Sequence, residues 1–93
     1  MATREKIQEQ IDLALAEQNA NQHEIVMYND DVNTFDHVID TLMRVCKHTA
    51  EQAEQCSLII HYKGKCTVKT GELEELIPQC TQLLEAGLSA EIV

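Results

Sequence analysis

The sequence predicts an α+β fold, with a small three-stranded antiparallel sheet packed against three helices in the order β-α-α-β-α-β and an N-terminal arm. Two observations predict it. Short strand-favouring runs occur at residues 24–28, 66–69 and 88–93, and the longer segments between them repeat apolar residues at helical spacing. A chain of 93 residues forms one domain, so every helix must add an apolar face to one small core.

Residues 1–23 are polar and charged, and we expect them to form an arm in front of a domain spanning residues 24–93. One narrow helical face, from Ile7 to Leu15, is the only apolar pattern in this segment. The pattern fits both a marginal helix and a flexible tail, and both alternatives stay open.

The first strand is the apolar run EIVMY at 24–28, which stops at the turn-forming residues NDD. Thr34 is placed to N-cap a helix over 35–47, because its hydroxyl can accept from a free N–H of the first turn. The apolar side of this helix carries Val38, Ile39, Leu42, Val45 and Cys46.

Thr49 and Gln52 form a capping box, which predicts the start of a second helix. That helix is expected to end near His61, with Gly64 as its left-handed C-cap. Its core face carries Ala53, Cys56, Ile59 and Ile60.

A strand over 66–69 follows, and we expect Thr70 and Gly71 to form the turn into the third helix. Pro78 interrupts that helical pattern, so the helix either starts late, with Pro78 in its first turn, or kinks there. Gly87 is expected to end the helix before the final strand. The apolar repeat consists of Leu73, Leu76, Ile77, Cys80, Leu83 and Leu84.

The net charge is −9, from seven Lys and Arg against sixteen Asp and Glu. An acidic surface repels phosphate, so nucleic acid and anionic membranes are not expected partners. No apolar run approaches the ~20 residues of a membrane-spanning helix. The N-terminus, MATREKIQEQ, lacks the apolar core of a signal peptide, so we expect a cytoplasmic protein.

Four cysteines occur, and none forms a CxxC pair. We expect reduced thiols that pack as small apolar groups, with no metal and no cofactor. They are Cys46, Cys56, Cys66 and Cys80.

The side chains that could carry chemistry are Asn29, Asp30 and Asp31 after the first strand, and His61 at the end of the second helix. The triplet fits an ordinary turn, yet adjacent carboxylates repel each other unless a cation or donors lie nearby. A metal ion, a basic side chain or a ligand ammonium group could supply that charge. His61 follows an apolar stretch and could simply interact with the helix dipole. No nucleophile or phosphate-binding motif is present.

The patterns NDDxxTxxxV, VIDTL, AEQ and HYKGK together resemble the ClpS family, the small adaptor proteins of the Clp protease. The resemblance covers residues 25–66 well and 67–93 loosely, and it does not extend to 1–23. It implies the same α+β fold that the periodicity predicts.

The resemblance implies an adaptor rather than an enzyme. ClpS-like proteins bind proteins by a bulky hydrophobic N-terminal residue, the N-degron, and hand them to a Clp AAA+ unfoldase coupled to ClpP. By this resemblance Asn29, Asp30 and His61 hold the α-amino group, and Asp31 belongs to the same motif. The implied pocket for the side chain consists of Phe35, Val38, Ser57 and Ile60.

Three departures from the family pattern affect side-chain preference and docking. The usual Thr-Pro-Met after NDDx is replaced by a segment ending in Phe35, and a second pocket Met is replaced by Ser57. The resemblance assigns ATPase docking to Glu74, but Gln79 stands where the family has Lys. We expect aromatic N-terminal residues to gain most from the altered pocket.

The expected partners are the N-terminal domain of a Clp AAA+ ATPase and N-degron proteins, with the chain itself a monomer. One alternative is a regulator that docks on the Clp ATPase without selecting N-degrons. Another is a small enzyme that uses Asp30, Asp31 and His61 as acid–base groups.

Overall fold

The computed structural model describes Ile7 and residues 22–93. The predicted arm therefore lies almost wholly outside the described residues. The first strand begins at His23, one residue before its predicted start. No helix in the described part of the chain is both long enough and apolar enough to cross a membrane.

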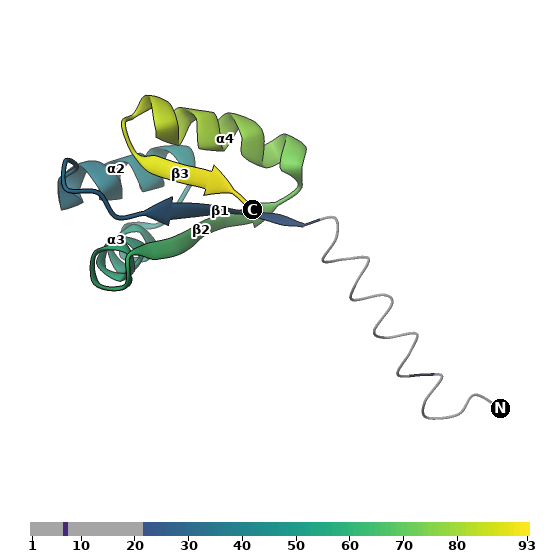
Figure 1. The fold of residues 1–93 in the computed structure, drawn as a ribbon, viewed down its shortest axis with the longest axis horizontal. Coiled ribbons are helices and arrows are strands. Elements are labelled where there is room, and N and C mark those ends of the chain that lie inside the picture. The colour runs from purple at the N-terminus through teal and green to yellow at the C-terminus, as the bar shows by residue number, and fades with distance from the viewer. Residues whose placement is uncertain (1–6, 8–21) are drawn as a thin grey trace.

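Three helices and three strands follow one another in the order that the sequence predicted (Figure 1). The elements are β1 (His23–Tyr28), α2 (Phe35–Val45), α3 (Ala50–Lys63), β2 (Lys65–Gly71), α4 (Leu73–Glu85) and β3 (Ser89–Ile92). The strands form one antiparallel sheet in the order β2-β1-β3, so the strand that leads into the NDD triplet lies at its centre. The predicted α+β class and element order are confirmed.

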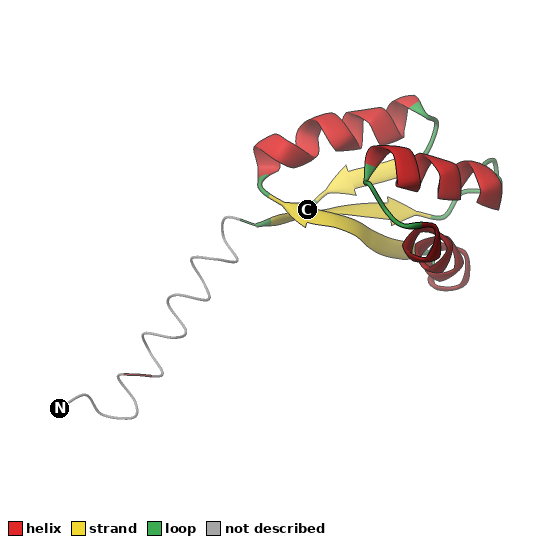
Figure 2. Cartoon of the chain, turned by 180° about the vertical axis from the view of Figure 1, so that it is seen from behind, coloured by secondary structure: helices red, strands yellow, loops and turns green. Residues whose placement is uncertain are grey.

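The helices cover the sheet from the side on which β1 buries Ile25 and Met27 (Figure 2). Helix α4 packs along β3, α3 packs along β2, and α2 packs mainly against α3. Successive side chains of a strand point to opposite faces of the sheet, so Ile25 and Met27, two positions apart, lie on the same face and pack into the core.

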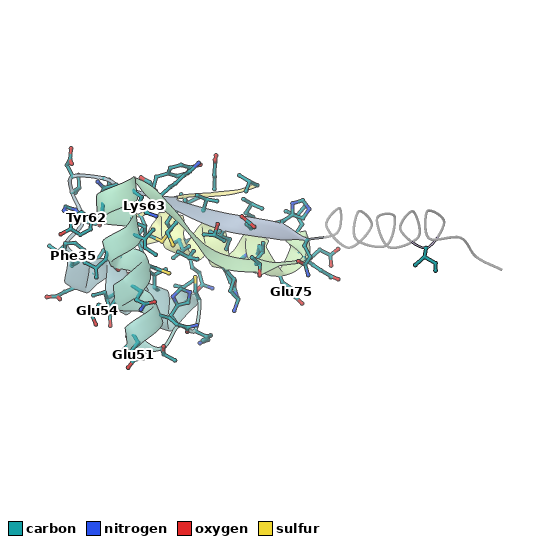
Figure 3. The ribbon with its side chains drawn as sticks, turned by 90° about the horizontal axis from the view of Figure 1, so that it is seen from below. Phe35, Glu51, Glu54, Tyr62, Lys63 and Glu75 are labelled. Carbon is teal, nitrogen blue, oxygen red and sulfur yellow. The ribbon has the colours of Figure 1, made fainter. Side chains whose placement is uncertain are left out.

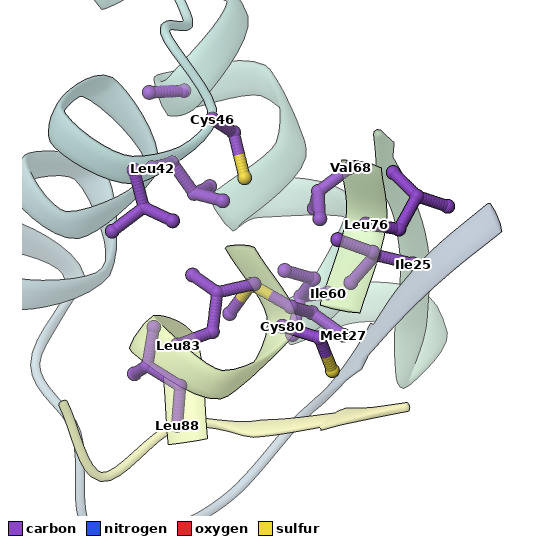
Figure 4. Close-up of a cluster of buried hydrophobic side chains, with 12 residues drawn as sticks. Ile25, Met27, Leu42, Cys46, Ile60, Val68, Leu76, Cys80, Leu83 and Leu88 are labelled. Atoms are coloured by element: carbon purple, nitrogen blue, oxygen red, sulfur yellow. The ribbon is translucent and has the colours of Figure 1, made fainter. Parts of the chain in front are cut away.

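The core joins all six elements or their flanking turns (Figure 4). Cys46 and Cys80 are buried members of it, and all four cysteines are free thiols, as predicted. Burial is the main cause that raises the pKa of the Cys56 thiol to about 12, and the adjacent Cys66 thiol contributes to the same shift. The buried core residues are Ile25, Met27, Leu42, Val45, Cys46, Ala53, Ile60, Val68, Leu76, Cys80, Leu83 and Leu88.

The predicted helix caps are present. The Thr34 hydroxyl accepts from the His37 N–H at 3.2 Å, and the Thr49–Gln52 capping box has both of its bonds. Gly64 has a φ of 90°, a left-handed conformation that strains any residue with a Cβ. Each local signal thus sets one helix boundary.

Two boundaries differ from their predictions in ways that have a clear physical cause. Thr70 and Gly71 do not form a turn, because both extend β2 and pair with Glu24 and His23 of β1. The first helix stops at Val45 instead of residue 47. Lys47 has a left-handed φ of 59°, which no α-helix can continue through.

Helix α4 does not start late, because Leu73 is its first residue and Pro78 lies inside it. Proline lacks the N–H that would donate to the carbonyl of Glu74, so one helical hydrogen bond is lost. Leu76 and Leu83, on either side of Pro78, are both buried. Their packing stabilises the helix against this local cost.

Leu83 and Leu84 provide a direct test of the core. Leu83 is fully buried, whereas its neighbour Leu84 is 52% exposed. We expect Leu83→Ala to lower the free energy of unfolding by about 2–5 kcal/mol in urea denaturation, because it leaves a cavity. Leu84→Ala, the matched control, is expected to change it by less than about 1 kcal/mol. Equal losses from the two variants would contradict this assignment of the core face.

Candidate functional site

A cavity of about 290 Å³ opens where the end of β1, the start of α2 and the end of α3 meet. Its volume lies near the lower end of the range for small-molecule sites, about 300–1,000 Å³. That size suits one large side chain rather than a folded partner. The lining residues are Met27, Tyr28, Asn29, Asp30, Asp31, Asn33, Thr34, Phe35, Val38, Ser57, Ile60, His61 and Leu88.

The exposed part of the cavity lining, the mouth, is mainly polar, and the buried part is mainly apolar. The exposed lining residues are Phe35 and four polar residues, Asn29, Asp31, Thr34 and His61. The buried lining residues mark the deep end, and they are Met27, Ser57, Ile60 and Leu88. A ligand with a charged end and an apolar end could therefore place each against a matching surface.

A backbone hydrogen bond holds the NDD segment after β1 beside the C-terminal end of α3. The N–H of Asn29 donates to the carbonyl oxygen of Gly64 at 2.9 Å. Gly64 is the C-cap of α3, only three positions after His61. The start of the NDD segment is thereby fixed beside the end of the helix that carries the imidazole.

The Asp30 carboxylate shapes the loop. One oxygen accepts from the N–H groups of Val32 at 3.0 Å and Asn33 at 2.8 Å, and the other accepts from the Asn33 side-chain amide at 2.8 Å. The backbone bond from Asn33 is the main cause that lowers the pKa of Asp30 below its ordinary value. The carboxylate therefore remains charged well below neutral pH.

Asn33 links this loop to a turn near the C-terminal end of the chain. Its amide nitrogen donates both to Asp30 and to the carbonyl oxygen of Gly87 at 2.9 Å, in the turn between α4 and β3. One side chain thus ties the NDD loop to the C-terminal turn. This role was not predicted from the sequence, although an asparagine three residues after an aspartate in a polar turn is a usable signal.

Aromatic contacts surround the imidazole of His61. Its ring centroid lies 5.2 Å from that of Phe35 and 5.0 Å from that of Tyr62, both within the usual range for aromatic pairs. Figure 3 shows Phe35 and Tyr62 together at the end of α3 where Lys63 closes the helix. Phe35 therefore contacts His61 directly and also forms part of the cavity wall.

The structure brings together all eight residues that the sequence analysis assigned to the amino-group and side-chain sites. Asn29, Asp30, Asp31, Phe35, Val38, Ser57, Ile60 and His61 all line this cavity. Glu74 does not, and it lies exposed in the first turn of α4. Among the lining residues that were not predicted, Met27 and Leu88 are core side chains whose apolar character alone gave no sign of a cavity.

Within the described residues, no three His, Cys, Asp or Glu side chains come together in a group able to hold a metal ion. The carboxylates at the mouth instead lie beside an amide and an imidazole. This set of acceptors fits a ligand that donates several hydrogen bonds and carries positive charge.

Comparison with known proteins identifies related sequences. The sequence model of a family described as "ATP-dependent Clp protease adaptor protein ClpS" matches residues 18–91. An ATP-dependent Clp protease adapter protein ClpS of Thermosynechococcus vestitus is 35% identical over 68 residues, which cover 72% of each chain. A protein of the same name from Campylobacter jejuni is 38% identical over 53 residues, which cover 55% of each chain.

Two further similarities are to a much longer protein and to a solved structure. E3 ubiquitin-protein ligase UBR1 of Drosophila melanogaster is 39% identical over 54 residues, which are 58% of this chain and 3% of that protein. The solved structure of Agrobacterium tumefaciens ClpS2 bound to L-phenylalaninamide superposes with a TM-score of 0.67 at 17% identity, covering 78% of this chain and 95% of that one. At that identity the structural match supports the fold alone.

Asn33→Ala tests whether this side chain contributes to the lowered pKa of Asp30. The variant removes the side-chain donor but keeps the backbone N–H that is the main cause of the shift, so we expect the pKa of Asp30 to rise only part of the way toward its ordinary value. A carboxyl NMR titration measures this directly. Gln22→Ala, which removes an exposed side-chain amide just before β1, is the control and should leave the titration unchanged.

The same pKa sets a pH dependence of stability. Because folding lowers the pKa of Asp30, its contribution is complete above the unfolded aspartate range and is lost as the pH falls through the lowered value. Asn33→Ala should therefore reduce the acid-induced loss of stability that Asp30 causes. Identical Asp30 titrations in the two proteins would show that the Asn33 side chain does not contribute to the lowered pKa.

Proposed function

The chain belongs to the ClpS family of adaptor proteins of the ATP-dependent Clp protease, and from that premise we propose that it binds proteins through a free, bulky hydrophobic N-terminal residue and delivers them to a Clp AAA+ unfoldase. One observation carries the proposal. Polar acceptors gather at the mouth of a cavity whose depth is largely apolar.

A free α-amino group matches the mouth. The ammonium group carries one positive charge and three N–H donors that point in different directions. The Asn29 side-chain carbonyl, the Asp31 carboxylate and the imidazole of His61 provide acceptors at that mouth. Asp30 adds negative charge nearby, although its oxygens already accept three hydrogen bonds within the loop.

This acceptor set disfavours internal segments of a protein. An internal peptide bond offers one N–H and no charge, so it would leave acceptors at the mouth without donors. An acceptor that the bound segment covers and separates from water, without giving it a donor, costs about 1–3 kcal/mol. Rejection of internal residues thus follows from the number of donors that the mouth requires.

The apolar depth supplies selection by side chain. Phe35, Val38 and Ile60 contribute apolar surface to the cavity, and burial of a Leu- or Phe-sized side chain is worth about 1.5–3 kcal/mol. The ClpS2 protein of Agrobacterium tumefaciens was solved with L-phenylalaninamide, a molecule with a free amino group and a benzyl side chain. A related fold thus accommodates the kind of ligand proposed here.

To deliver a bound substrate, the chain would dock on a Clp ATPase, and we propose that Glu74 is part of the docking surface. Glu74 is exposed in the first turn of α4, away from the cavity lining, so one partner could bind there while a substrate occupies the cavity. We assign no reaction to the chain, and we propose that the substrate leaves it chemically unchanged.

Two peptides that begin with Phe and differ only in N-terminal acetylation test the proposed function. We expect the free-amine peptide to bind at least about tenfold more tightly by fluorescence anisotropy, because acetylation removes the charge and two donors. The peptide should be recovered intact by mass spectrometry. Binding to neither peptide would indicate the alternative regulator without N-degron selection, and a modified peptide would indicate an enzyme.

Two substitutions test the acceptor role of His61. His61→Gln keeps a side-chain acceptor and should retain most of the affinity for the free-amine peptide, measured by fluorescence anisotropy. His61→Ala removes the acceptor and should weaken binding about tenfold. Unchanged affinity in His61→Ala would remove His61 from the site.

A further inference from the structure

Ser57 is a polar residue in the buried part of the cavity lining. Of the four buried residues that line the cavity in the described part of the chain, Ser57 is the polar one, and it is only 3% exposed. Met27, Ile60 and Leu88 are the other three. A hydroxyl among apolar side chains has few possible hydrogen-bond partners. Whether it donates or accepts in each bond therefore determines which ligand side chains can bind beside it.

The Ser57 hydroxyl proton is already used in a hydrogen bond within α3. Its oxygen lies 2.7 Å from the carbonyl oxygen of Ala53, one turn earlier in α3, to which it donates. A serine hydroxyl has one hydrogen and two lone pairs. The oxygen can therefore only accept from a ligand in the cavity. Donation to Ala53 also strengthens it as an acceptor, because consecutive hydrogen bonds polarise one another.

We propose that Ser57 makes the cavity selective for an N-terminal side chain that carries a hydrogen-bond donor at its far end, so that tyrosine is preferred over phenylalanine. This inference rests on the proposed function, because it places the α-amino group at the Asn29–His61 mouth. From there an aromatic ring extends toward the buried end, and the tyrosine hydroxyl is its most distant atom. That hydroxyl donates to the Ser57 oxygen.

Several other polar side chains do not meet this requirement. Serine and threonine are too short to reach the buried end, and they would leave the apolar walls uncovered. Aspartate and glutamate offer only acceptors and a negative charge, in a chain whose net charge is already −9. A lysine ammonium group could donate, but burying a charge among Met27, Ile60 and Leu88 costs far more than burying a phenol.

Three peptides that differ only in their first residue test the proposal on the unmodified chain. They begin with Tyr, Phe or p-fluorophenylalanine, the last having a ring substituent at the position of the hydroxyl that cannot donate. We expect the Tyr peptide to bind about 2–10-fold more tightly than both others by fluorescence anisotropy. Equal binding of the Tyr and p-fluorophenylalanine peptides would overturn the proposal.

Ser57→Ala removes the acceptor. The tyrosine hydroxyl would then be buried without a partner, so we expect the affinity for the Tyr peptide to fall about tenfold and that for the Phe peptide to change by less than about twofold. Thr81→Ala is the matched control. The Thr81 hydroxyl makes the same bond one turn back, to Ile77 at 2.8 Å, but on α4 and outside the cavity lining. It should change neither affinity.

The outcomes separate this proposal from the proposed function. Amine-dependent binding of the Phe peptide without any preference for Tyr would retain the proposed function and remove the role of Ser57. An equal loss for all three peptides in Ser57→Ala would also overturn selectivity by a hydrogen bond. If no free-amine peptide binds, both proposals fail. The comparison on the unmodified chain needs no variant, so it stands even if Ser57→Ala folds poorly.

Discussion

The candidate site depends on the backbone hydrogen bond between the Asn29 N–H and the carbonyl oxygen of Gly64. It joins the end of β1 to the end of α3, two points far apart along the chain. Gly64 can present its carbonyl there because its left-handed backbone turns the chain from α3 directly into β2. The acceptors from the NDD segment and the imidazole of His61 then share one mouth, although neither segment alone forms a site.

The loop after Asn29 is held at its other end by side chains. Asp30 receives two backbone N–H groups and the Asn33 amide, and Asn33 also reaches the carbonyl of Gly87. A loop fixed in this way keeps its acceptors in position before a ligand arrives, which reduces the entropy lost on binding. The main role of the Asp30 carboxylate is therefore to stabilise the conformation of the loop.

The fold class could be predicted because its signals are local, whereas the site could be predicted only in part. The caps at Thr49 and Gly64 lie next to apolar runs of clear period, and each sets a boundary without help from distant residues. Gly71 was mispredicted because pairing with β1 overrides turn propensity. The site residues were named through a family resemblance, which says nothing of the tertiary link from Asn33 to the C-terminal turn. The donation of the Ser57 hydroxyl to Ala53 within α3 depends on the three-dimensional structure and has no signal in the sequence.

The thiol of Cys56 stands next in sequence to Ser57, and its environment has a chemical consequence. Burial and the neighbouring Cys66 thiol raise the pKa of Cys56, which lowers the fraction of thiolate at neutral pH. Peroxides and alkylating agents react with the thiolate, so this position on the helix that frames the cavity is less reactive toward them than a cysteine of ordinary pKa.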